Sequence, residues 1–94
     1  MTFDANRYYR ISSAVTLRPE PFGALAYHFG QRRLTYLAAA DLVAVIGELA
    51  KPEGPHGRRN ASQAMAAAGV SADRRPAIES ALASLVDRGV LDAT

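Results

Sequence analysis

Several residue types are scarce or absent in this 94-residue chain, and each absence narrows what it can be. Without cysteine it can hold neither a disulfide nor an iron–sulfur cluster ligated by its own cysteines. Tryptophan is absent and only 7% of residues are aromatic, so the core must be built mainly from short aliphatic side chains. No secretory signal is present, and no stretch approaches the roughly 20 apolar residues of a membrane-spanning helix. We therefore expect a cytoplasmic protein without a membrane partner.

Groups of residues that could act together in catalysis or metal binding are equally scarce. The only histidines are His28 and His56, and neither has the partners that a nucleophilic or metal site needs. His28 is expected to be a surface or hydrogen-bonded structural residue. No glycine-rich phosphate loop follows a strand and opens a helix. The sequence therefore predicts no enzyme, no metal and no cofactor, and its length fits one domain over residues 1–94.

The N-terminal half predicts a three-stranded antiparallel meander. Alternation of apolar and polar residues marks three strands, Ile11–Arg18, Ala24–Phe29 and Arg33–Leu37. The first strand is expected to stop at Pro19, which cannot donate to a sheet ladder. Residues 1–9 have no period and are expected to form an irregular arm.

The C-terminal half predicts three helices. Apolar residues repeat at the helical spacing of about 3.6 residues from Ala38, and this first predicted helix ends before Pro52. Asn60 and Gln63 form a capping box for a short helix that Gly69 ends. A last helix is capped by Ser71 or Asp73 and ends at Gly89. The loop over residues 52–59, between the first helix and the short helix, is expected to be poorly ordered. The predicted fold class is α+β, winged helix-turn-helix-like, with a three-stranded antiparallel sheet followed by three helices.

A winged-helix DNA-binding regulator is the alternative function. A short helix, a Gly-Val turn and a longer helix recur in such domains. The net charge of +2 gives little support, and the outer face of the last helix combines Arg75 with Glu79 and Asp87. Because those carboxylates would face phosphate, we expect no nucleic-acid partner.

An open sheet edge indicates a different use. In a meander the first and third strands are both edges, and unpaired backbone groups on an edge can accept an extended peptide. Arg32 and Arg33 flank the third strand, and Arg74 and Arg75 open the last helix. These cations favour an acidic peptide. The same edge can equally pair with a second copy, so a homodimer stays open as an alternative.

The motifs of the N-terminal half resemble one known family. They are Tyr9-Arg10-Ile11, the Arg-Pro-Glu-x-Phe-Gly-Ala-Leu run at residues 18–25 preceded by Leu17, Tyr27-His28-Phe29-Gly30, and Arg32-Arg33-Leu34. Together they resemble the mycofactocin biosynthesis chaperone family, over nearly the whole chain. That family is similar to the small peptide-binding domain of pyrroloquinoline quinone biosynthesis, a RiPP recognition element.

The resemblance implies a non-enzymatic adaptor with two partners. It would bind the acidic leader of a ribosomally made precursor peptide by strand addition and present it to a radical S-adenosylmethionine maturase, which decarboxylates and crosslinks a C-terminal Val-Tyr pair. The leader would add to the third strand and lie against the last helix. The peptide-binding positions implied are Arg32, Arg33, Leu34, Thr35, Tyr36, Leu37, Arg75, Ile78, Glu79 and Leu82.

Overall fold

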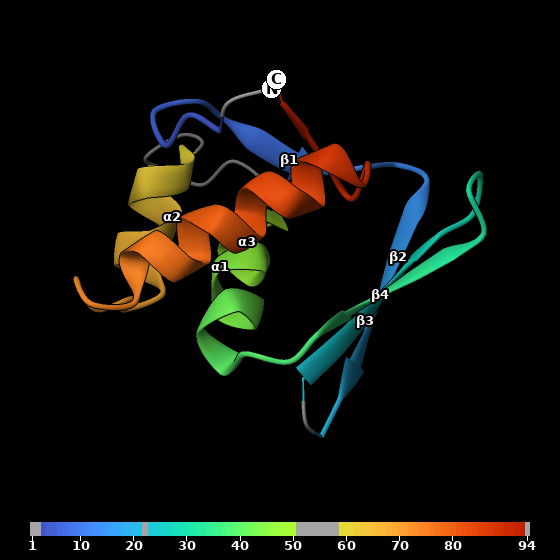
Figure 1. Cartoon of the computed structure of the whole chain (residues 1–94), viewed down its shortest axis with the longest axis horizontal. Helices are drawn as coiled ribbons and strands as arrows, with labels where there is room; N and C mark the ends of the chain where they lie inside the picture. The colour runs from blue at the N-terminus through green and yellow to red at the C-terminus, as the bar shows by residue number, and fades with distance from the viewer. Residues whose placement is uncertain (1–2, 22, 51–58, 94) are drawn as a thin grey trace.

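The computed structural model of the chain describes residues 3–21, 23–50 and 59–93. Figure 1 shows the helices packed together and the larger sheet projecting to one side of them. The elements, in chain order, are β1 (Tyr9–Ile11), β2 (Val15–Glu20), β3 (Gly23–His28), β4 (Arg33–Leu37), α1 (Ala40–Ala50), α2 (Ala61–Ala67), α3 (Arg75–Asp87) and β5 (Leu91–Ala93). The predicted α+β class, with a three-stranded antiparallel sheet and three helices, is confirmed. The predicted loop over residues 52–59 lies almost wholly outside the described residues.

The three-stranded sheet has the order β2-β3-β4. Its register pairs Leu17 with Ala26 across the first hairpin and Ala26 with Thr35 across the second. Within the described residues β2 and β4 each have a single neighbour, so both are edges. The bounds of β4 coincide with the predicted strand, because alternating residues and the turn at Gly30 are local signals.

The predicted strand over residues 11–18 is wrong in one respect, since the chain forms two strands there. Ser12 interrupts it: the Ser12 side chain accepts a hydrogen bond from the Ala14 N–H at 3.2 Å, and its carbonyl accepts one from Val15 at 3.0 Å. Before this turn, β1 pairs with β5 at the far end of the chain. The expected irregular arm therefore contains the start of a strand, and Tyr9 is buried in the core.

Pro19 does not end its strand, contrary to the prediction. β2 continues to Glu20, and Pro19 pairs with Ala24. A proline is tolerated on an edge strand when the missing N–H would have pointed away from the neighbouring strand. Pro19 therefore occupies a position of β2 whose backbone groups point away from β3.

The helices begin and end largely at the predicted signals. Asn60 caps α2, and its side chain and that of Gln63 exchange hydrogen bonds with each other's backbone N–H at 2.8 and 2.9 Å. Neither Ser71 nor Asp73 caps α3 through its side chain; instead the Ser71 carbonyl accepts hydrogen bonds from the N–H groups of Arg74 and Arg75. None of the described helices is long and apolar enough to cross a membrane.

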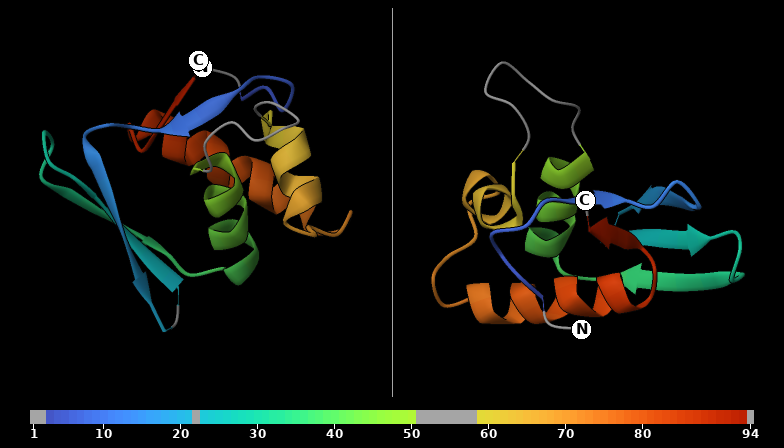
Figure 2. Two further views of the ribbon diagram at one scale, coloured as in Figure 1. Left: turned by 180° about the vertical axis from the view of Figure 1, so that it is seen from behind. Right: turned by 90° about the horizontal axis from the view of Figure 1, so that it is seen from above.

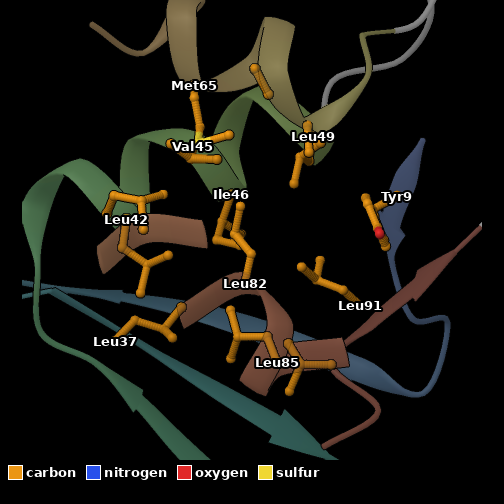
Figure 3. Packing of buried hydrophobic residues seen from close by; sticks show 14 of the residues in the cluster. Tyr9, Leu37, Leu42, Val45, Ile46, Leu49, Met65, Leu82, Leu85 and Leu91 are labelled. Atoms are coloured by element: carbon orange, nitrogen blue, oxygen red, sulfur yellow. The ribbon is translucent and has the colours of Figure 1, made fainter. Parts of the chain in front are cut away.

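A single apolar cluster joins the helices to both sheets. Figure 3 shows side chains from β4, α1 and α3 converging, among them Leu37, Leu42 and Leu82. Ala24 and Ala26 of β3 are buried on the same face of the larger sheet. Short side chains there let the helices approach closely, which is how a core poor in aromatic residues is filled. The opposite face of this sheet is not part of the cluster.

Candidate functional site

Backbone groups alternate in direction along β4, which is an edge strand within the described part of the chain. The Phe29 N–H donates to the Ala14 carbonyl on the β2 side at 2.9 Å. In an antiparallel sheet successive residues direct their N–H and C=O groups to opposite sides. Because Phe29 directs its backbone groups toward β2, the even-numbered residues Ala24 and Ala26 of β3 direct theirs toward β4. Their partners on β4 are Leu37 and Thr35. The residues between and beside these partners, Leu34 and Tyr36, therefore direct their backbone groups away from the sheet.

A groove of about 240 Å³ runs beside this edge. Figure 2, right view, shows β4 as the strand of the larger sheet that lies nearest α3. The groove is lined by β4, by one residue at the start of α1 and by the C-terminal half of α3: Leu34, Thr35, Tyr36, Leu37, Leu42, Ala81, Ser84, Leu85 and Arg88. An unpaired strand edge beside an apolar groove is the arrangement that accepts an extended peptide.

The two ends of the groove differ in chemistry. A Cβ placed on Gly89 would lie 3.3 Å from Nε2 of His28 and 3.4 Å from Nε2 of Gln31, so the end of α3 meets the hairpin between β3 and β4. Arg88 therefore lies at the hairpin end of the groove. The opposite end, where β4 leads into α1, is apolar and includes Leu42. His28 itself accepts a hydrogen bond from the Gln31 N–H through Nδ1 at 3.2 Å, a structural contact.

The strand positions that the sequence assigned to peptide binding lie together at the groove. All four of residues 34–37 line it. Arg33 is exposed at the start of β4, on the same strand face as the buried Thr35 and Leu37. Arg32 precedes the strand in the hairpin with φ of 50°, and it does not line the groove.

The helix positions that the sequence assigned lie elsewhere. Ile78 and Leu82 are 1% and 0% exposed and belong to the core. Arg75 donates to the Ser62 hydroxyl at 2.5 Å and lies 3.9 Å from Glu79, next to α2 rather than beside β4. None of these four lines the groove.

The helix residues that do line the groove are not among the predicted peptide-binding positions. They lie at positions i, i+3, i+4 and i+7, and so share one face of α3 and its C-cap: Ala81, Ser84, Leu85 and Arg88. That spacing is visible in the sequence, but a helical stripe does not say whether its apolar face meets the core or a groove. Leu85 does both, since it is buried and also forms part of the groove floor.

An ion pair joins the two helices that flank the groove. Arg74 donates to the Asp41 carboxylate at 2.8 and 3.2 Å, and Asp41 also accepts from the Leu42 N–H at 2.9 Å. The hydrogen bond from Arg74 holds the pKa of Asp41 below its ordinary value. Among the described residues no group of three or more histidine or carboxylate side chains is placed to hold a metal ion.

The outer face of the larger sheet carries exposed aromatic and aliphatic side chains. Tyr27 and Leu34 are register partners, as are Leu25 and Tyr36. Phe29, Leu34 and Tyr36 are 52%, 62% and 50% exposed. The rings of Tyr27 and Phe29 meet edge to face with centroids 5.7 Å apart. An exposed apolar surface of this kind is a candidate surface for protein interaction.

Within the residues that the structure describes, the fold and the site therefore define a small α+β domain with an edge strand, β4, beside a groove. Residues 8–92 match the peptide chaperone MftB family, and the chain belongs to that family. The resemblance to mycofactocin biosynthesis chaperones is thereby confirmed.

Individual relatives agree with the family match. The chain is similar to the peptide chaperone MftB of Mycolicibacterium smegmatis, with 40% identity over 91 residues that cover 97% of this chain and 83% of that protein. It is also similar to the peptide chaperone MftB of Mycobacterium ulcerans, with 50% identity over 48 residues, which are 51% of this chain and 44% of that protein. No solved structure matches the chain.

Proposed function

We propose that this chain is a non-enzymatic chaperone of mycofactocin biosynthesis that binds the acidic leader of a precursor peptide along β4 and presents it to a radical S-adenosylmethionine maturase in the cytoplasm. In this proposal residues 1–94 act as one peptide-recognition domain. The observation that carries it is that β4 has β3 as its single strand neighbour among the described residues, and that Leu34 and Tyr36 direct their backbone groups to its other side, beside a groove. Membership of a peptide chaperone family supports the same reading.

Strand addition at this edge fixes how the leader would lie. Its backbone would exchange hydrogen bonds with Leu34 and Tyr36, because only those residues of the central part of β4 have groups pointing away from β3. Leader side chains opposite Thr35 would then enter the groove, since residues directly opposite in a sheet share a face. The leader residues between them would extend the outer apolar face of the sheet.

The outer face supports the second half of the proposal, the contact with the maturase. Tyr27 and Phe29 are exposed and lie on β3 and its following turn, away from the groove lining. A bound leader would enlarge this face by its own outward side chains. A protein that docks there would therefore contact the chaperone and the leader together.

A proline substitution on β4 tests the strand addition. We expect Leu34→Pro to weaken binding of a fluorescently labelled leader about tenfold or more, because it removes an outward N–H and restricts the edge backbone. The matched control is Leu34→Ala, which truncates the same side chain and keeps the N–H. Edge strands tolerate proline at such positions, so circular dichroism should show a folded variant. Equal affinities of Leu34→Pro and Leu34→Ala would refute strand addition at β4.

Self-association gives a second readout of the same edge. A homodimer that pairs two β4 edges would use the groups that the leader needs, so leader binding and dimer formation would exclude each other. Sedimentation with increasing leader should therefore convert any dimer into leader-bound monomer. A dimer that binds leader without dissociating would place the leader on another surface.

A further inference from the structure

The arginines near the groove differ in whether they already form an ion pair with a carboxylate of the same chain. Arg74 is bound to Asp41, and Arg75 contacts Ser62 and Glu79. Arg88 lines the groove, is exposed, and makes no ion pair with any residue in the described ranges. The cations at the start of α3 are thus engaged within the fold, whereas the one at its end is open to a ligand.

Arg33 lies toward the same end of the groove. It shares a strand face with Thr35 and Leu37, whose side chains are buried toward the helices, so its own side chain projects on the α3 side. It is the register partner of His28, beside which the end of α3 packs at Gly89. Two exposed arginines therefore lie toward this end of the groove: Arg88, which lines it, and Arg33, which directly precedes the lining residue Leu34.

The other end of the groove has only apolar side chains in this part of the structure. Leu37 at the end of β4 and Leu42 in α1 line the groove there, and Ala81 is the lining residue of α3 that lies farthest along the helix from Arg88. Residues 33 and 37 are separated by four positions of an extended strand, about 13 Å. The groove thus offers a cationic end and an apolar end on one face of the added strand.

We propose that Arg88 and Arg33 form a carboxylate-binding subsite, which takes an aspartate or glutamate of the leader four residues from an apolar side chain seated on Leu37 and Leu42. This inference rests on the proposed strand addition. The even spacing is required because side chains alternate between the two faces of a strand. The subsite would set the register of the leader, and it holds for either strand direction.

A double-mutant cycle between protein and peptide tests the subsite. Each acidic residue of a fluorescently labelled leader is replaced in turn by its amide, and each peptide is titrated against the unchanged protein and against Arg88→Gln. We expect one replacement to weaken binding about fivefold, and Arg88→Gln to weaken binding of the unchanged leader to a similar extent. The two changes together should be no worse than either alone.

Arg10→Gln is the matched control, since it removes the same charge from an exposed position on β1 that does not line the groove. It should leave the ranking of the peptides unchanged. The subsite is refuted if every amide replacement has the same effect on Arg88→Gln as on the unchanged protein. If Leu34→Pro still weakens leader binding more than Leu34→Ala in that case, the result refutes only the subsite and still supports strand addition.

The spacing is tested separately. One threonine inserted between the identified acidic residue and the apolar residue four positions away moves one of them to the opposite face of the strand. We expect this leader to lose affinity about fivefold or more, whereas insertion of two threonines restores the shared face and recovers part of the loss. Equal loss with one and with two inserted residues would overturn the proposed register.

Discussion

Arg74 and Asp41 are joined by two hydrogen bonds, from Nε to Oδ2 at 2.8 Å and from Nη2 to Oδ1 at 3.2 Å. Arg74 directly precedes α3, and Asp41 lies in the first turn of α1. The residue after Asp41 is Leu42, which lines the groove. This pair therefore connects the two helices whose side chains face β4.

The pair makes stability depend on pH in a defined window. Because the hydrogen bond from Arg74 lowers the pKa of Asp41 below 3.8, the stabilisation is present above that ordinary value and is lost as pH falls through the lowered one. We expect Asp41→Asn to lower the melting temperature slightly at pH 7, and by less below pH 3.8. Thermal unfolding at several pH values measures this. An equal decrease at neutral and acid pH would mean that the carboxylate charge is not responsible.

A glycine at the start of β3 is needed for the sheet to form. Gly23 has φ of 151°, and a Cβ there would overlap the carbonyl oxygen of Leu37. We expect Gly23→Ala to lower the free energy of unfolding by about 1–3 kcal/mol or more. Gly47→Ala is the control, because nothing lies within 4 Å of a Cβ at that position in α1, and it should be stabilising by up to about 1 kcal/mol. Urea unfolding of the two variants compares them, and similar midpoints would contradict this explanation.

The outer face of the sheet should separate partner binding from leader binding. The double substitution Tyr27→Ser and Phe29→Ser removes two exposed rings outside the groove lining. We expect it to weaken binding to the maturase more than about tenfold, as loss of aromatic anchors does, and to leave leader affinity unchanged. Tyr8→Ser removes an exposed ring outside the larger sheet and serves as control. Unchanged maturase affinity of the double variant would rule out docking on this face.

Local signals in the sequence were sufficient for much of the fold. The strand at residues 33–37 and the capping box of Asn60 and Gln63 depend on neighbouring residues, and both are found as predicted. The pairing of β1 with β5 joins the two ends of the chain, and nothing near Tyr9 indicates a strand partner more than 80 residues away. The separation of residues 11–18 into two strands comes from the turn at Ser12, which the alternation of apolar and polar residues does not indicate.

The groove could be predicted only in part. Its strand half, residues 34–37, was named from the sequence because an edge strand is recognisable by its place in a meander. Its helix half was not, since Ile78 and Leu82 have the same spacing and character as residues that line a groove. Which stripe of α3 meets β4 depends on the angle at which the helix packs, and no single side chain encodes that angle. The place of Arg88 at the groove depends on α3 ending beside the hairpin, and no local signal in the sequence indicates this.

Amide hydrogen exchange at Leu34 and Tyr36, measured with and without saturating leader, tests the central claim most directly. If the leader adds as a strand to β4, exchange at these two outward N–H groups slows strongly, while exchange at Thr35, which already faces β3, changes little. Unchanged exchange at both Leu34 and Tyr36 when the leader is bound would contradict the account.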